Sequence, residues 1–247
     1  MGERTTIITS DGGFSAYVAR PKGASAPAVV VIQEIFGVNQ VMRDITDGLA
    51  GQGYLAICPD LFWRIEPGID ITDQTEAEWK LAFSYYQAFD VDKGVEDIGA
   101  TIAATRADPG CNGKVGAVGY CLGGLLAFLT ATRTDSDASV SYYGVGIDKV
   151  VGEAEKLANP LLLHIAEKDQ FVPPEARASP GNPLWPTPAF PPAPPAAPGW
   201  LAAPSPAPPP PPAITSSDPN TVADELPPPP APPRLEPRFA PPAPPSG

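Results

Sequence analysis

The chain has 247 residues and a formal net charge of −12, enough length for one large α/β domain or two small ones. Because the acidic balance comes with no block of Lys or Arg, it argues against nucleic acid and anionic membrane surfaces as partners. The opening residues lack the apolar region of a secretory signal, and no window reaches the ~20 apolar residues of a membrane span. We therefore expect neither a leader nor a membrane anchor.

Proline divides the sequence into two parts. Of the 36 prolines, 30 lie in residues 173–247, a density typical of low-complexity chain rather than of a packed core. We predict a folded body over residues 1–175 and a disordered, Pro/Ala-rich tail over residues 176–247. Two origins of the tail stay open: a shifted reading frame in GC-rich coding sequence, which we favour, and a genuine interaction segment with PxxP-like motifs.

The first third of the body is predicted to hold three or four strands and one helix. β-rich runs on both sides of Asp11, within residues 5–21, indicate a hairpin. A continuous apolar run in residues 26–37 is typical of a strand buried on both faces. Apolar residues at helical spacing over 38–54 predict a helix, and residues 54–62 predict the next short strand.

The rest of the body alternates helices with strands. Residues 75–107 are predicted to be mostly helical, with a break near 89–94. The later elements are a strand over 114–120, a helix over 121–134, a strand over 138–144, a short helix over 147–158 and a last strand over 160–169. This alternation implies right-handed crossovers and a mainly parallel sheet, so the fold class is α/β.

The stretch GYCLG, Gly119 to Gly123, fits the pattern G-x-C-x-G, the cysteine form of the nucleophile elbow. In such an elbow a strand ends and a helix begins at the nucleophile, here Cys121, and the flanking glycines let neighbouring backbone come close. The helix start is expected to lower the pKa of the thiol, and the Leu122 amide is expected to point toward a developing oxyanion. The alternative is a buried structural cysteine in a glycine-rich turn.

The cysteines predict neither a disulfide framework nor a metal site. Cys58, Cys111 and Cys121 are an odd number without metal-ligand spacing. They fit a reduced, cytoplasmic setting, which also suits a catalytic thiol. We interpret Cys58 and Cys111 as structural.

Taken together, these segments resemble the dienelactone hydrolase family (carboxymethylenebutenolidases) of the α/β-hydrolase fold. The resemblance covers about residues 5–175, and QEIFG at 33–37 together with GYCLGG at 119–124 is a specific combination. It implies a mainly parallel sheet flanked by helices, here without the usual final strand and helix. It also implies transfer of an acyl group from a small-molecule lactone or ester to water, without metal or organic cofactor. We expect a monomer.

The resemblance gives five residues a role. Cys121 would be the nucleophile, and Asp169 the triad acid that orients an imidazole. Glu34 would be the extra carboxylate that the family holds near the thiol, where it helps to generate the thiolate when substrate binds. The amides of Ile35 and Leu122 would be the two oxyanion donors. A turn-capping role for Asp169 and a salt bridge for Glu34 are the alternatives.

The base of the expected triad is missing. The family's histidine should follow Asp169, but residues 170–247 contain no histidine, and the single one in the chain is His164. Because His164 lies inside an apolar strand, we predict a core histidine that points into a helix layer, well below the site. Activity should then fall by orders of magnitude. The alternative function is a non-catalytic, hydrolase-like protein that presents its proline-rich tail to a partner.

A second departure from the family concerns the substrate. Relatives that act on carboxylated lactones hold the carboxylate with arginines, one of them on the helix before Tyr85. Here the segment 76–84 contains Trp79 and Lys80 but no arginine. Lys80 or Arg64 is the candidate replacement, as a less specific positive charge. The identity of the lactone or ester therefore stays open.

Overall fold

A computed structural model describes residues 2–166, 169 and 171–172. The predicted tail over 176–247, and the final strand and helix that the sequence was expected to lack, lie outside the described residues. No helix in the described ranges has the length and apolar character that a membrane crossing requires.

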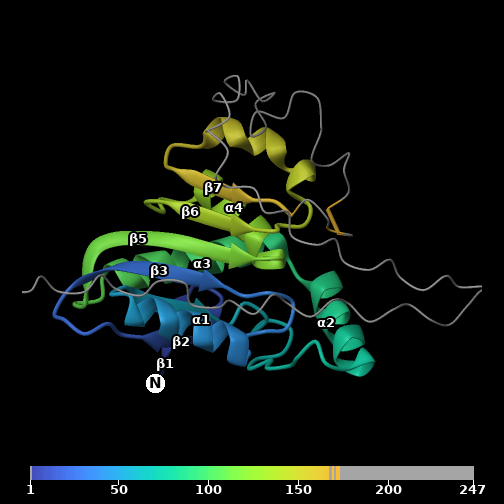
Figure 1. Cartoon of the computed structure of the whole chain (residues 1–247), viewed down its shortest axis with the longest axis horizontal. Coiled ribbons are helices and arrows are strands. Elements are labelled where there is room, and N and C mark those ends of the chain that lie inside the picture. Colours follow the sequence, from blue (N-terminus) through green and yellow to red (C-terminus); the bar gives the residue numbers. More distant parts are fainter. Residues whose placement is uncertain (1, 167–168, 170, 173–247) are drawn as a thin grey trace, which may run out of the picture. The chain divides into compact units, whose positions relative to one another are not determined.

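In the part of the chain that the structure describes, seven strands form one mixed sheet in the order β1-β2-β4-β3-β5-β6-β7 (Figure 1). The strands are β1 Glu3–Thr9, β2 Gly12–Ala19, β3 Ala26–Ile32, β4 Leu55–Pro59, β5 Cys111–Tyr120, β6 Ser139–Tyr142 and β7 Leu161–His164. β2 pairs antiparallel with both β1 and β4, and the remaining neighbours are all parallel. The predictions of a hairpin at the start and of a mainly parallel sheet are confirmed.

Three of the four α-helices in the described residues begin where a polar side chain caps them. The described part contains α1 Gln40–Gly51, α2 Glu76–Ala88, α3 Val91–Arg106 and α4 Leu122–Arg133. Asn39, Thr75 and Asp90 each accept a backbone N–H from the first turn of α1, α2 and α3, which satisfies a donor that has no partner inside the helix. Phe89 and Asp90 separate α2 from α3, as the predicted break near 89–94 requires.

One predicted helix is wrong in type. Residues 147–158 form two 3₁₀ segments, η1 Ile147–Lys149 and η2 Val151–Lys156, instead of one short α-helix. Val150 between them has φ −120° and ψ 7°, outside the helical region. The segment therefore bends at Val150 rather than continuing as a regular helix.

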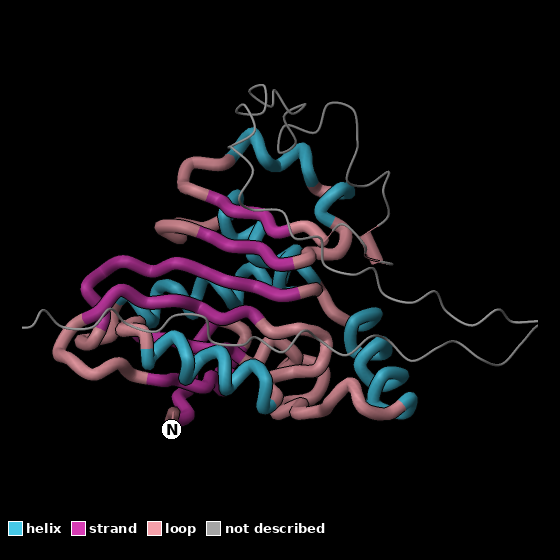
Figure 2. The backbone as a smooth tube through the Cα atoms, viewed as in Figure 1, coloured by secondary structure: helices cyan, strands magenta, loops and turns pink. Residues whose placement is uncertain are grey.

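Helices cover both faces of the sheet (Figure 2). On one face, buried residues of α3 and α4 such as Ile98, Ile102 and Leu126 pack against the strands. On the other face, Met42 of α1 packs with Val31 and other strand residues. The central strands are buried from both sides, which explains why their sequences are continuous apolar runs.

An inner strand and an edge strand of the sheet differ in burial. Leu55 of β4 is 2% exposed, whereas Leu162 of β7 is 53% exposed among the described residues. His164, at the end of β7, is exposed as well. The prediction of a core histidine is wrong, because β7 is the outermost described strand and its alternate residues face outward.

Candidate active site

The turn between β5 and α4 has the geometry of an elbow. Cys121 has φ 54° and ψ −112°, a conformation that non-glycine residues rarely adopt. Its N–H donates to the Tyr142 carbonyl oxygen at 3.1 Å, which fixes the turn to the end of β6. A Cβ atom on Gly119 or Gly123 would overlap neighbouring backbone. The two glycines are therefore required for the chain to reverse at Cys121.

Glu34 lies in the loop that follows β3, at the carboxyl end of the sheet. Its Oε1 accepts a hydrogen bond from the Tyr143 hydroxyl at 3.2 Å. Burial raises the pKa of the Glu34 carboxyl, the Tyr143 bond opposes that shift, and the charge of Asp73 adds to it. The alternative of a salt bridge finds no partner, since no Lys, Arg or His of the described part lies within ion-pair distance of Glu34.

The thiol of Cys121 is held in its protonated form. Burial raises its pKa to about 12, the charge of Glu34 acts in the same direction, and that of Asp169 contributes less. A hydrogen bond from the Leu122 N–H lowers the pKa but does not compensate. The expected lowering of the pKa is therefore wrong for this state, because burial and two acidic neighbours outweigh the helix terminus.

Asp169 lies in the loop after β7 and is close enough to Cys121 for its charge to act on the thiol. One of its oxygens accepts the Phe171 N–H at 2.8 Å, a bond typical of a turn-capping aspartate. The structure thus brings the charge of Asp169 within reach of the Cys121 thiol and gives Asp169 a turn-capping bond as well.

The two expected oxyanion donors lie on either side of Cys121 in the fold. Leu122 is the first residue of α4, and its N–H points at the sulfur. Ile35 is 6% exposed, and no group of the described residues accepts its N–H. A buried amide without a partner is uncommon. The Ile35 N–H thus has no acceptor among the described residues, whereas the Leu122 N–H is directed at the Cys121 sulfur.

His164 is displaced sideways from Cys121 rather than below it. By register Tyr120 pairs with Tyr142, and Tyr142 with His164, so the three side chains are level along the strands. The His164 ring stacks on Tyr142 with centroids 4.4 Å apart and planes 3° apart. Two strand spacings amount to about 10 Å. The structure brings His164 next to Tyr142, and not next to Cys121.

Two tyrosines of the site were missed by sequence reasoning. Tyr143 directly follows β6 and adopts φ 41°, and its hydroxyl donates a hydrogen bond to Glu34. Tyr86, on the last turn of α2, lies near Cys121: burial raises its pKa, and the Cys121 charge adds to the shift. Because parallel strands end at one edge, the position of Tyr143 directly after a strand was a usable signal. Tyr86 carried no such signal.

The two candidate replacements for the substrate arginine differ in whether their charge is already paired. Arg64 forms ion pairs with Asp97 and Asp11 and stacks over the Trp63 ring at 4.3 Å, so its charge is already neutralised. Lys80 is exposed on α2 and has no ion pair within the described residues. The expectation for Arg64 is wrong, and that for Lys80 stays a prediction.

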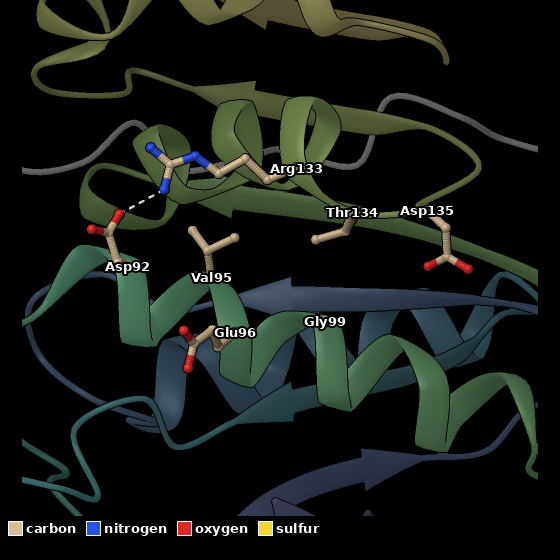
Figure 3. A pocket seen from close by; sticks show the side chains of 7 residues that line it. All are labelled: Asp92, Val95, Glu96, Gly99, Arg133, Thr134 and Asp135. Carbon is tan, nitrogen blue, oxygen red and sulfur yellow. Dashed lines mark hydrogen bonds and ion pairs between the residues drawn. The ribbon is translucent and has the colours of Figure 1, made fainter. Parts of the chain in front are cut away.

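A hollow of about 410 Å³ lies elsewhere, between α3 and α4 (Figure 3). Its one cation, Arg133, already binds Asp92 at 2.6 Å and Glu153 at 2.5 Å, so it offers no free charge to a ligand. The lining residues are Asp92, Val95, Glu96, Gly99, Arg133, Thr134 and Asp135. Among the residues that the structure describes, no three His, Cys, Asp or Glu side chains form a group that could hold a metal ion.

Comparison with known proteins points to one family. The model of the dienelactone hydrolase family matches residues 14–182. A protein of Azospirillum brasilense, provisionally named a carboxymethylenebutenolidase, is 54% identical over 189 residues, covering 70% of this chain and 77% of that protein. The carboxymethylenebutenolidase of Pseudomonas putida is 46% identical over 178 residues, covering 72% and 75%. A crystal structure from Klebsiella pneumoniae, provisionally named a dienelactone hydrolase, superposes with TM-score 0.60 at 28% identity, covering 72% and 77%.

Proposed function

Because the chain belongs to the dienelactone hydrolase family, we propose that it cleaves a lactone or small ester with Cys121 as the nucleophile. The observation that carries this proposal is the turn at Cys121, which holds a non-glycine residue at φ 54° next to two glycines that cannot be larger. A strained backbone of this kind persists only where the surrounding structure enforces it, and it is typical of active sites.

The chemistry follows from the groups around the sulfur. Cys121 Sγ attacks the carbonyl carbon, the S–C bond forms, and the carbonyl electron pair moves onto oxygen near the Ile35 and Leu122 amides. Collapse of this intermediate breaks the bond to the alkoxide and leaves a thioester. Water then attacks the thioester carbonyl, and the C–S bond breaks with its electron pair on sulfur. Each half-reaction needs a group that takes up a proton and returns it.

The group that would accept the Cys121 proton is the part of this scheme that the described residues supply least well. The chain's single histidine, His164, lies two strands away from Cys121 in register. With a thiol pKa of about 12, very little thiolate exists at neutral pH. Glu34 has a raised pKa and lies close enough to affect the thiol, which makes it the nearest candidate to accept a proton. We expect turnover at least about a thousandfold below that of relatives with a triad histidine.

Acylation of the full-length chain tests the nucleophile. After incubation with p-nitrophenyl acetate, peptide mass spectrometry should find the acetyl group on Cys121, and the Cys121→Ala variant should carry none in that peptide. Added imidazole should accelerate release of nitrophenolate by the wild type beyond its effect on Cys121→Ala, because it supplies the missing base. Acetylation of other residues only, or equal rates for the two proteins, would contradict the proposal.

A further inference from the structure

Four aromatic rings form a continuous row beside the proposed site. Phe36 and Trp79 meet edge to face with centroids 5.1 Å apart, Trp79 and Phe83 lie 5.7 Å apart, and Phe83 and Phe171 lie 6.5 Å apart. We call these four residues the aromatic row. They come from three segments: the loop after β3, helix α2, and the loop after β7.

Each segment of the aromatic row also carries a group of the site. Phe36 follows Glu34 by two residues, and Phe171 follows Asp169 by two residues. Helix α2, which carries Trp79 and Phe83, ends near Cys121, because the charge of Cys121 contributes to the raised pKa of Tyr86. In Figure 1, α2 lies past the carboxyl ends of β3 and β5, the edge at which the site is built. The aromatic row therefore borders the reacting groups.

The outer half of the aromatic row is open to solvent. Phe83 is 37% exposed and Phe171 is 44% exposed, whereas Phe36 is 8% exposed. Trp79 is fixed by its indole N–H, which donates to the Asp73 carbonyl at 2.9 Å. Trp79 is held in place, and its outer neighbours Phe83 and Phe171 are exposed. These rings offer apolar surface to a ligand, and little conformational entropy of Trp79 is lost when the ligand binds.

Among the described residues, the charged groups that act on this part of the site are acidic. Glu34, Asp73 and Asp169 are the acidic groups of this region: Asp73 raises the pKa of Glu34, and Asp169 acts on the Cys121 thiol. Lys80 is the nearest basic residue in sequence, but it points about 100° around the helix axis from Trp79. Trp79 and Phe83, four residues apart, share a helix face instead. A carboxylated ligand would meet these negative charges, and Arg64, the candidate guanidinium, is already paired with Asp97 and Asp11.

We infer that the aromatic row is a subsite for an uncharged, apolar or aromatic acyl group, so that the preferred substrate is a neutral ester or lactone and not a carboxylated one. This inference rests on the proposed function, because it names the substrate class of the same site. Apolar surface that leaves water on binding drives the preference, and the acidic surroundings sharpen it.

Two matched ketones test the subsite, since a ketone presents the carbonyl but has no leaving group. Benzylacetone carries a neutral phenyl ring, and its para-carboxylated analogue adds one charged group to that ring. In ligand-observed NMR titrations of the full-length chain we expect benzylacetone to bind about tenfold more tightly than its carboxylate. Equal affinities, tighter binding of the carboxylate, or no binding of either ketone would overturn the inference.

Substitutions in the aromatic row test whether these rings cause the preference for benzylacetone. Phe83→Ala should weaken benzylacetone about fivefold, because an exposed ring is lost from the surface, and Trp79→Arg should reverse the preference between the two ketones. Phe83→Arg, at an exposed position, repeats the reversal should Trp79→Arg fail to fold. Ile8→Ala, at a 74% exposed apolar residue on β1, is the matched control and should change neither affinity. A preference that survives both arginine variants would overturn the inference.

The same titration separates this inference from the proposed function. Cys121→Ala should keep the preference for benzylacetone, because the aromatic row does not include the thiol. A chain that is never acylated on Cys121 but still prefers the neutral ketone would refute the nucleophile and leave the subsite standing. A chain that is acylated equally well by neutral and by carboxylated donors would refute the subsite and leave the nucleophile standing.

Discussion

The region around Asp97 and the region around Glu34 each enclose a carboxylate, but among the described residues only the first supplies a cation. Asp97 on α3 is 1% exposed, and its Oδ2 accepts the Trp63 indole N–H at 2.8 Å and pairs with Arg64. Glu34 has the Tyr143 hydroxyl and acidic neighbours instead. A buried carboxylate that is paired belongs to the framework, whereas one left without a cation costs stability and is typical of a reactive site.

Removing the cation from the Asp97 region should have the largest effect. Arg64→Met should lower the free energy of unfolding by about 3 kcal/mol, because Asp97 is left buried without a counter-charge. Arg20→Met is the matched control, since Arg20 pairs with Glu3 and Asp108 at the surface and should cost less than about 1 kcal/mol. Urea unfolding of the full-length proteins at neutral pH measures both, and equal losses would contradict the distinction.

Alkylation of Cys121 probes the Glu34 region next. Because burial raises the thiol pKa to about 12, the reactive thiolate should increase about tenfold per pH unit, or about a hundredfold from about pH 7 to about pH 9. The measurement is the rate of modification by iodoacetamide in a Cys111→Ser background, with buried Cys58 as the internal reference. Glu34→Gln should speed the reaction at any one pH, since it removes a negative charge near the sulfur. A rate that levels off within this range would refute the raised pKa.

Neutral isosteres of the two carboxylates should change stability in opposite directions. Asp97→Asn should cost about 2 kcal/mol, since it weakens hydrogen bonds made to a charged group. Glu34→Gln should instead stabilise the fold by about 1 kcal/mol at neutral pH. Because the folded-state pKa of Glu34 lies above its ordinary value of 4.5, the destabilisation begins as the pH rises past that value and is absent below it.

Urea unfolding midpoints of the wild type and of both variants, measured at about pH 4 and about pH 7, therefore test this difference between Asp97 and Glu34. The advantage of Glu34→Gln should be present at the higher pH and vanish at the lower one. Loss of stability in both variants would mean that Glu34 is a framework residue like Asp97.

The sequence predicted most of the architecture because its patterns are local. The apolar run that became β3, the cap at Asp90 and the glycines around Cys121 are all readable within a few residues. The elbow itself was predicted from five residues, and Glu34 was placed near it through the family resemblance. The strand, the cap and the elbow were predicted from spacing along the chain, and Glu34 from the resemblance.

Three of the wrong predictions depend on contacts between distant residues. Arg64 forms ion pairs with Asp97 and Asp11, which lie 33 and 53 residues away along the chain. The thiol pKa depends on how deeply Cys121 is buried and on acids from two other loops. His164 looked like a core residue because its neighbours are apolar, but exposure is set by which strand ends the sheet. Burial and edge position are properties of the assembled fold.

Gly123 has a consequence for how this protein can change. A Cβ atom there would meet the Ile32 and Gln33 carbonyl oxygens, so main chain touches main chain between the turn of Cys121 and the loop of Glu34. The separation of these two loops is therefore set by peptide groups and not by side chains. Mutation can remodel the surrounding side chains, and with them ligand preference, while main-chain packing keeps the interval between the sulfur and the proposed oxyanion donor.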